Sequence, residues 1–492
     1  MKKQQRSRAE YFVELAGRVK KLPVLAVIGT LVPVYTSRKQ PVSKQELYEA
    51  CTGQYLALCP FHADESLGSF VITPKKDMWW CFAEGLGGNG ISFEMKYFDL
   101  GFKEAVFHLA KRFSLLTAEE EKQYGNKKID EDVVKHVESS FKRKQREVRT
   151  APADVTAMVY DAIPKVCPLK EKHKKHLVKE RMLEKDDLGD YFTFPTRKMD
   201  LARAVYRQIG AQEAMKVYGK KITELRDEEC RALEERLSDV RENIPYVPGF
   251  FFDGMKVDFS STRGIGFLVR DENGIPEGIQ IRRDSVREGE SRYVWFSSSF
   301  AAYKDGCRGG SSPGAPGGVI FPRGERKDMT PALCITEGRF KAEAIAKKGN
   351  IAVYVSGVSS WKNIIPVVEN LKGNNRHVFI MFDADMMGNT AVHGQLFQMC
   401  SMLGQLGLMP VLVLWRIRDG KGFDDLVLRY GNDYAERLTY MTFPKFEGIY
   451  QKALLEVLKE MSAADIREMD AEKRGQFTKL LQSRVEKEAC KE

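Results

Sequence analysis

Between residues 331 and 432 the chain alternates short apolar runs with longer stretches in which apolar and polar residues mix. Short apolar runs predict buried strands, and the mixed stretches between them predict helices. The predicted strands are residues 332–336, 351–355, 377–382 and 410–414, and the predicted helices lie near residues 340–348, 361–371 and 390–406. Alternation of this kind predicts a parallel sheet covered by helices.

The pattern changes between residues 242 and 300, where short β-rich runs are separated by Gly, Asp, Asn and Pro. The sequence Asp-Glu-Asn-Gly at residues 271–274 predicts a hairpin turn. Residues 306–318 are rich in Gly, Pro and Ser, which predicts a mobile loop or linker. We therefore expect a β-rich subdomain with a Gly-rich linker over residues 242–330.

Helical patterns dominate most of the remaining chain. Residues 170–185 form a strongly basic helical stretch, in which His173 and His176 are expected to be solvated. The apolar run at residues 22–35 is interrupted by prolines and is too short to cross a bilayer, so it predicts a soluble helix. The other expected segments are a helical arm (1–40), a compact module (41–116), a charged linker or solvated helix (117–154), a helical basic region (155–241) and a helical tail (433–492).

Composition narrows the class of protein. A chain of 492 residues is long for a single core, so two or three domains are expected. The formal net charge of +10 favours a polyanionic partner such as nucleic acid, or else an acidic membrane surface. The nine cysteines show no spacing typical of secreted domains and no signal peptide is evident, so a reduced cytoplasmic setting is expected.

Carboxylates follow three of the predicted strands. Glu337 follows the first, Asp383 and Asp385 follow the third, and Asp424 and Asp425 come after the fourth. Functional groups of open α/β sheets lie outside the carboxyl ends of strands, and alternate residues of an extended segment point the same way. A single Asp at a strand end is usually a cap or turn residue. The combination instead predicts a site for Mg²⁺ or Mn²⁺, which prefer hard oxygen ligands.

These motifs resemble the Toprim domain of primases and topoisomerases. TEGRFKAEAIA is similar to the motif whose glutamate acts as general base or organises the metal site, a role that the resemblance gives to Glu337. FDADMMGNTAV resembles the Asp-x-Asp motif, which implies metal ligation by Asp383 and Asp385, and GKGFDDLV resembles the downstream acidic motif of primases. Lys341 stands where bacterial primases often carry an acidic residue; a cation there could contact nucleotide or template phosphate.

A second candidate metal site lies near the N-terminus. Cys59 and His62, with two residues between them, can hold one metal from a tight turn, and Cys81 could supply a third ligand. CPFHADESLGSF, WWCF and GLGGNGISF resemble the zinc ribbon of DnaG-type bacterial primases over about residues 50–113. The family's fourth ligand is a cysteine, but Glu84 occupies that position here. Glu84 could coordinate zinc, Cys51 could replace it, or the ribbon has lost its metal.

Several cations are candidates for contact with nucleic acid or nucleotide. Lys75 and Lys76 in the ribbon are expected to neutralise DNA phosphates, whereas Trp79 and Phe82 are expected in the ribbon core. The β-rich region resembles the N-terminal subdomain of the primase polymerase core. The resemblance suggests that its arginines hold template or triphosphate oxygens, and these arginines are Arg282, Arg283 and Arg292.

The sequence is therefore interpreted as a multidomain α+β and α/β protein similar to DnaG-type primases of plasmids, phages or conjugative elements. The resemblance implies RNA primer synthesis on single-stranded DNA from ribonucleoside triphosphates, with one structural Zn²⁺, catalytic Mg²⁺ or Mn²⁺, and a separate replicative helicase as a further partner. Two alternatives stay open: a Toprim-type nuclease, and a catalytically degenerate DNA-binding replication or mobilisation factor.

Overall fold

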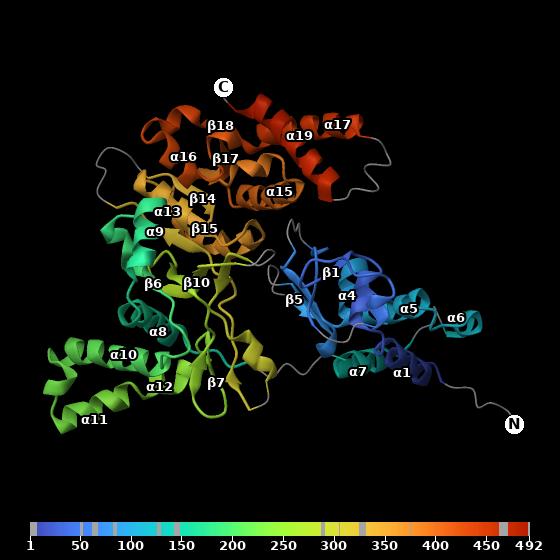
Figure 1. Cartoon of the computed structure of the whole chain (residues 1–492), viewed down its shortest axis with the longest axis horizontal. Helices are drawn as coiled ribbons and strands as arrows, with labels where there is room; N and C mark the ends of the chain where they lie inside the picture. The colour runs from blue at the N-terminus through green and yellow to red at the C-terminus, as the bar shows by residue number, and fades with distance from the viewer. Residues whose placement is uncertain are drawn as a thin grey trace. The chain divides into compact units, whose positions relative to one another are not determined.

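The protein was analysed as a computed structural model (Figure 1), which describes residues 7–49, 53–61, 67–81, 86–124, 129–141, 148–286, 291–304, 306–323, 331–374, 376–461 and 471–490. The chain divides into two compact units. The smaller unit contains residues 1–146 and 286–292, and the larger unit contains residues 147–285 and 293–492.

The smaller unit contains an antiparallel sheet with the strand order β1-β2-β3-β4-β5. Its strands are β1 (Val34–Thr36), β2 (Tyr55–Ala57), β3 (Phe70–Thr73), β4 (Met78–Cys81) and β5 (Leu86–Gly88). Its helices are α1 (Arg8–Val19), α2 (Val24–Gly29), α3 (Glu46–Glu49), α4 (Gly90–Phe98), α5 (Phe102–Arg112), α6 (Ala118–Tyr124) and α7 (Glu131–Phe141). The expected helical arm is wrong in one respect, because β1 lies within it and pairs with β2.

Aromatic side chains form the centre of this unit. Trp79 is almost fully buried, and its ring stacks on Phe70 with 5.2 Å between the ring centroids. Phe93 packs edge-on against Trp79 at 5.9 Å. The prediction that Trp79 belongs to the ribbon core is therefore confirmed, while Phe82 lies outside the described residues. Helix α1 contributes Phe12 to the same core, so it is packed rather than extended away from the unit.

The first part of the larger unit combines helices with two small antiparallel sheets. One sheet has the strand order β11-β10-β9-β6 and the other the order β12-β7-β8. Its strands are β6 (Tyr191–Thr193), β7 (Phe250–Phe252), β8 (Val257–Phe259), β9 (Gly264–Arg270), β10 (Pro276–Arg283), β11 (Tyr293–Trp295) and β12 (Arg308–Gly309). Its helices are α8 (Ala153–Val166), α9 (Glu171–Arg181), α10 (Leu201–Tyr218), α11 (Asp227–Arg236) and α12 (Ser238–Asn243).

Three expectations for this part can be compared with the structure. The hairpin turn between β9 and β10 is confirmed, and the Asp271 carboxylate accepts hydrogen bonds from the backbone N–H groups of Asn273 and Ile275. Strand β6 was not expected in the helical basic region. The Gly-rich segment is not a free linker, because Ser311 is buried and donates a hydrogen bond of 3.0 Å to the Tyr246 carbonyl.

The expectation that His173 is solvated is also wrong. This residue is buried on α9, where its ring nitrogens lie 2.9 Å from the Thr193 hydroxyl and 2.9 Å from an Asp284 carboxylate oxygen. His176 is half-buried and pairs with Glu180 at 2.7 Å. These contacts attach α9 to strand β6 and to the end of β10. The basic helix is thereby fixed beside the four-stranded sheet of this first part.

The second part of the larger unit is a mixed sheet with the strand order β13-β15-β14-β16-β17-β18. Its strands are β13 (Gly318–Ile320), β14 (Leu333–Glu337), β15 (Ile351–Val355), β16 (His377–Met381), β17 (Met409–Leu414) and β18 (Thr439–Thr442). The helices are α13 (Arg339–Lys347), α14 (Ile365–Leu371), α15 (Thr390–Gln405), α16 (Phe423–Tyr430), α17 (Phe443–Glu460) and α19 (Ala471–Ala489).

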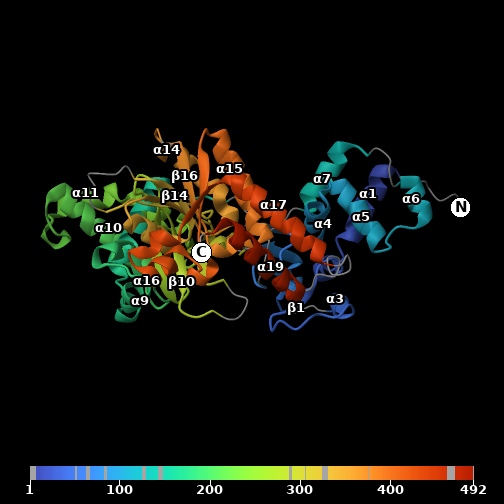
Figure 2. The same ribbon diagram turned by 90° about the horizontal axis from the view of Figure 1, so that it is seen from above.

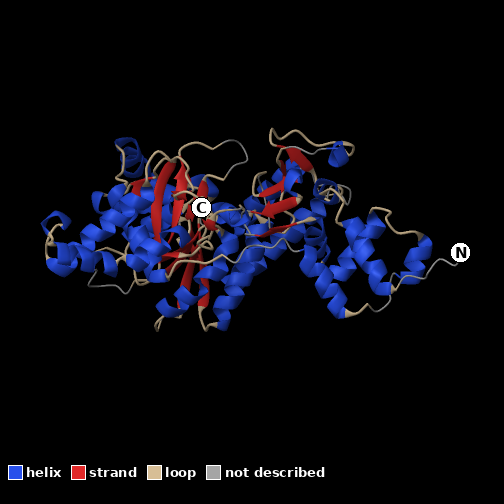
Figure 3. Ribbon diagram, turned by 90° about the horizontal axis from the view of Figure 1, so that it is seen from below, coloured by secondary structure: helices blue, strands red, loops and turns tan. Residues whose placement is uncertain are grey.

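All four predicted strands and all three predicted helices of this sheet are confirmed. The four predicted strands run parallel, whereas the edge strands β13 and β18 pair antiparallel with β15 and β17. The predicted parallel sheet is therefore confirmed for these four strands, and two antiparallel edge strands that were not predicted extend it. Figure 2 shows α14 and α15 on one side of the strands and α16 on the other, and Figure 3 shows the strands enclosed by helices.

The expectation of a wholly helical tail is wrong at β18, and the tail is part of the sheet's core. Phe446 of α17 and Leu481 of α19 are fully buried in the same cluster as the sheet strands. A Cβ at Gly388 would lie 2.5 Å from the Thr478 carbonyl oxygen of α19, so only glycine permits this close approach. Among the helices that the structure describes, none combines the length and apolar character needed to cross a membrane.

Candidate active site

The predicted carboxylates meet at one edge of the mixed sheet. Strand β14 ends on Glu337, Asp383 follows the end of β16, and the GKGFDD segment follows β17. Because β14, β16 and β17 run parallel, their carboxyl ends lie at the same edge. A cleft of about 210 Å³ opens there, and the charged residues that line it include Glu337, Lys341, Asp383, Lys421, Asp424 and Asp425.

Glycine is required immediately after Glu337. Gly338 has φ +80° and ψ 151°, a conformation that is essentially restricted to glycine. Its N–H donates a hydrogen bond of 2.7 Å to the Val355 carbonyl of the neighbouring strand. The preceding Thr336 donates its hydroxyl to the Met381 carbonyl at 2.7 Å. The end of β14 is thereby attached to both neighbouring strands, which fixes the position of Glu337 in the lining of the cleft.

The loop that carries Asp383 and Asp385 is held from two directions. The backbone N–H of Ala384, the residue between the aspartates, donates to the Lys421 carbonyl at 2.9 Å. The Ala384 carbonyl accepts a hydrogen bond of 2.8 Å from the side chain of Gln482, which lies on α19. The first contact brings the GKGFDD segment beside the Asp-x-Asp segment. The second makes the tail helix a support of the candidate site.

Three cations of the chain pair with these carboxylates. Lys341 Nζ lies 2.8 Å from Asp383 Oδ1, and Lys421 Nζ lies 2.7 Å from Asp385 Oδ2. Arg181, in the last turn of α9, reaches Asp424 Oδ2 at 3.0 Å. Asp425 takes a different role, because its Oδ2 accepts the Gly422 N–H at 3.2 Å at the start of α16.

Burial governs the protonation of the acidic group at the centre of the cleft. Burial raises the pKa of Glu337 to about 7; Asp383 and Asp385 act in the same direction, whereas Lys341 and Lys421 oppose it. Burial also raises the pKa of Asp383, against the opposing effect of Lys341. A carboxyl group with a pKa near neutrality can accept or release a proton under ordinary conditions, as an acid–base group requires.

The oxygen donors suit a hard divalent cation, but the cations of the chain occupy the space between them. Within the part of the chain that the structure describes, no group of three or more His, Cys, Asp or Glu side chains is placed to hold a metal ion. Asp424 Oδ1 and Asp383 Oδ1 lie 2.4 and 3.5 Å from one point, the position that a Cβ at Gly422 would take. Carboxylate oxygens are the donor type that a hard divalent cation prefers.

The three arginines predicted to contact phosphate lie in two different parts of the chain. Arg282 and Arg283 lie at the end of β10 and are half-buried. Arg282 is two residues from Gln280, which lines the cleft, so both start from the same face of the strand. Arg292 is exposed and belongs to the smaller unit. The structure therefore places Arg282 near the cleft within one unit and does not place Arg292 there.

Sequence reasoning missed three basic residues of this region. Lys421 and Arg181 pair with predicted carboxylates, as described above. Arg339, which follows the Glu-Gly pair, is buried and forms ion pairs with Glu343 at 2.9 Å and with Asp190 at 3.0 Å. It also donates to the Leu268 carbonyl of β9 at 2.8 Å. Arg339 therefore links the first turn of α13 to the β-rich part of the unit. The feature of the sequence that could have identified Arg339 is its position directly after the Glu-Gly pair.

The two described zinc candidates lie at one end of the ribbon sheet. Cys81 ends β4, where it is paired with Phe70, and Phe70 is in turn paired with Ala57 at the end of β2. Cys59 follows two residues later, and both cysteines are buried. Thiolates are preferred ligands of structural zinc, so this end of the sheet fits the metal in donor type. The other candidates, His62, Glu84 and Cys51, lie outside the described residues.

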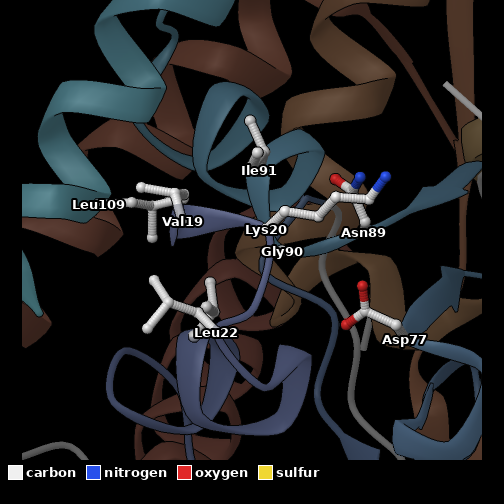
Figure 4. Close-up of a pocket in the computed structure, with 9 residues that line it drawn as sticks. Val19, Lys20, Leu22, Asp77, Asn89, Gly90, Ile91 and Leu109 are labelled. Carbon is white, nitrogen blue, oxygen red and sulfur yellow. The ribbon is translucent and has the colours of Figure 1, made fainter. Parts of the chain in front are cut away.

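The remaining ribbon features do not form a ligand site. Lys75 and Lys76 lie in a short 3₁₀ helix (Pro74–Lys76) between β3 and β4, and both are exposed. A cavity lined by Lys20, Asp77 and Asn89 has a volume of about 10 Å³ (Figure 4). That volume holds about one water molecule, so the cavity is too small for a nucleotide.

Comparisons with known proteins were consistent with the ribbon resemblance. Residues 43–125 match the family model described as the CHC2 zinc finger, the zinc ribbon of DnaG. Residues 326–434 match a model described as a domain of unknown function, so the Toprim resemblance stays a prediction. A crystal structure of the Aquifex aeolicus primase, with its zinc-binding and RNA polymerase domains, aligns over 98% of this chain and 97% of its own at 18% identity. The TM-score of 0.38 is too low to establish a shared fold.

Curated relatives match short stretches of the chain. A DNA primase of Synechococcus elongatus is 40% identical over 74 residues, which is 15% of this chain and 10% of that protein. A DNA primase of Pseudomonas aeruginosa is 37% identical over 92 residues, 19% of this chain and 13% of that protein. The matches thus span roughly a tenth of the relatives' length. The family model identifies a zinc ribbon of the DnaG type within residues 43–125 of this chain, and the relatives that match short stretches of the chain are DNA primases.

Proposed function

We propose that this chain is a DNA primase that synthesises short RNA primers on single-stranded DNA by metal-dependent nucleotidyl transfer. The observation that carries the proposal is the cleft in which Glu337 and Asp383 meet Asp424 and Asp425. It lies on the same chain as a zinc ribbon of the DnaG type. Because the relatives are matched over roughly a tenth of their length, the activity itself is inferred from this combination.

The net positive charge supports a single-stranded DNA partner. In the smaller unit, the exposed Lys75 and Lys76 can neutralise backbone phosphates. In the larger unit, Arg282 starts from the face of β10 that carries the cleft-lining Gln280, whereas Arg283 starts from the opposite face. A guanidinium can donate paired hydrogen bonds to phosphate oxygens. Ribonucleoside triphosphates are the proposed substrates, and a separate replicative helicase is a further proposed partner.

Asp383 and Asp385 are the proposed ligands of Mg²⁺ or Mn²⁺, with Asp424 and Asp425 as further candidates. When bound, the metal supplies positive charge to the triphosphate oxygens. Glu337, whose pKa is raised to about 7 by burial, can accept the proton of the attacking 3′-hydroxyl. Lys421 is 61% exposed, so its side chain can leave Asp385 and meet an incoming phosphate.

A primer-synthesis assay tests the proposal. The purified chain is incubated with a single-stranded template, Mg²⁺ or Mn²⁺, and labelled ribonucleotides. We expect short oligoribonucleotides from the wild type and at least a hundredfold less product from Asp383→Asn. Asp433→Asn is the matched control, because Asp433 is an exposed aspartate at the start of a 3₁₀ helix (Asp433–Arg437) and does not line the cleft.

The same reaction separates the alternatives. Cleaved template that depends on Asp383 would indicate a Toprim-type nuclease. Template binding without any product, in the wild type and in both variants, would indicate a DNA-binding replication or mobilisation factor. Lys341 is the specific observation that keeps this last function in view, because it occupies space between carboxylates that a metal would share.

A further inference from the structure

Lys341 is surrounded by carboxylates from three segments of the larger unit. Its ammonium nitrogen lies 2.8 Å from Asp383 Oδ1. Burial disfavours its charged form, but Asp383 and Glu337 outweigh burial, and the pKa of Lys341 is raised to about 12. Asp424 acts in the same direction. The Lys341 ammonium group therefore lies against Asp383 in the lining of an acidic cleft.

The end of this side chain fills a defined space. Asp424 Oδ1, Lys341 Cε and Asp383 Oδ1 lie 2.4, 2.7 and 3.5 Å from the position that a Cβ at Gly422 would take. Lys341 Cε and one oxygen from each of two carboxylates, which come from different strand ends, thus lie within 3.5 Å of one point. A divalent ion shared by Asp383 and Asp424 would need the same space, because metal–oxygen bonds of Mg²⁺ are about 2.1 Å long.

The second lysine of the cleft is held much less firmly. The Lys421 and Asp385 side chains are 61% and 36% exposed, whereas those of Lys341 and Asp383 are 20% and 13% exposed. Exposed ion pairs contribute little free energy, so a divalent ion can displace Lys421 from Asp385 at small cost. Displacing Lys341 would leave its charge in a buried position, which is far more costly. The two lysines are therefore not equivalent toward a metal.

We infer that the Lys341 ammonium takes the place of one of the two divalent cations used in paired-metal phosphoryl transfer, so that the cleft binds a single Mg²⁺ or Mn²⁺ ion. This inference rests on the proposed function and makes it more specific. Asp385, released by Lys421, is the carboxylate open to that ion. Lys341 supplies a fixed charge beside Asp383 and Asp424 that does not depend on the metal concentration.

Mn²⁺ binding to the full chain tests this without reference to activity. Calorimetry and electron paramagnetic resonance give the number of Mn²⁺ ions bound, after the zinc content has been measured separately. We expect one Mn²⁺ per wild-type chain. Lys341→Met, which removes the charge at similar length, is expected to bind two ions with a spin-coupled spectrum. Lys341→Arg keeps the charge and is expected to bind one, as is Lys421→Met, in which the exposed lysine is the matched control.

Other numbers of bound Mn²⁺ ions would contradict either the role inferred for Lys341 or the proposed function. Two ions in the wild type, or one ion in Lys341→Met with unchanged affinity, would overturn the role assigned to Lys341 while leaving metal-dependent primer synthesis intact. No Mn²⁺ in any of the proteins would contradict the proposed function, and the inference with it. Thermal unfolding of each variant confirms that it is folded. If Lys341→Met does not fold, Lys341→Gln provides the same comparison with a polar neutral side chain.

Discussion

Replacing Glu337 with glutamine is expected to change how the stability of the larger unit depends on pH. Burial raises the pKa of this carboxyl from 4.5 to about 7. A raised pKa in the folded state means that the folded protein binds the proton more tightly than the unfolded chain does. The resulting stabilisation is fully present below about pH 4.5, and it is lost as the pH rises through about 7. Glutamine carries no titrating proton, so Glu337→Gln removes this dependence.

The size of the change in the free energy of unfolding follows from the pKa shift of Glu337. One pKa unit corresponds to about 1.4 kcal/mol, so the shift from 4.5 to about 7 corresponds to about 3 kcal/mol in total. About 2 kcal/mol of that change falls between pH 5.5 and pH 8. The free energy of unfolding of wild type minus that of Glu337→Gln should therefore fall by about 2 kcal/mol across this interval. The variant should gain relative stability at the alkaline end.

The measurement is urea unfolding followed by circular dichroism, in the presence of a chelator weak enough to leave the ribbon zinc in place. The smaller unit is identical in both proteins, so its contribution cancels in the difference. Glu369→Gln, which removes an exposed glutamate on α14 outside the cleft, serves as the control for loss of a carboxyl group elsewhere. A difference between wild type and Glu337→Gln that stays constant within about 0.5 kcal/mol from pH 5.5 to pH 8 would refute the reasoning.

Three further changes have expected outcomes. Gly338→Ala should lower the free energy of unfolding by about 1–3 kcal/mol, because alanine at φ +80° is strained. Gly357→Ala is the control and should have a much smaller effect, because Gly357 has an extended φ of −175°. Equal losses of stability in the two variants would contradict this reasoning. Arg339→Met should cost about 3–5 kcal/mol in urea unfolding, because the buried Glu343 loses its ion-pair partner and Asp190 keeps only Arg270. A loss under about 1 kcal/mol would argue against the network. Metal analysis should find one zinc ion per wild-type chain and none in Cys59→Ser, and Glu84→Ala should retain its zinc less firmly. An unchanged zinc content in Cys59→Ser would exclude the ribbon site.

The central strands and the carboxylates could be predicted because both depend on short-range patterns. A parallel strand buried on both faces is an almost continuous apolar run, so 351–355 and 377–382 were identifiable without tertiary information. Glu337 and Asp383 directly follow such runs, and the topology of a parallel sheet then brings them to one edge.

The strands and contacts that the sequence did not predict depend on residues that are far apart in the chain. Strands β6, β13 and β18 have three or four residues each, which is too short for a periodic signal against helical surroundings. Arg181 is 243 residues from its partner Asp424, so no local pattern links them. His173 stands among lysines in the sequence, yet its partners Thr193 and Asp284 come from elsewhere in the chain. A charged neighbourhood in sequence therefore does not establish exposure.

The packing of α19 determines how far a recombinant fragment must extend. The family match over the sheet ends at residue 434, but Gln482 donates the hydrogen bond to the Ala384 carbonyl between the two aspartates. Met387, fully buried beneath this helix, has its sulfur 3.8 Å from that of Cys490. A fragment cut at the family boundary would expose this methionine to water and remove the helix that supports the loop carrying Asp383 and Asp385. Expression for crystallography should therefore retain the chain through residue 490.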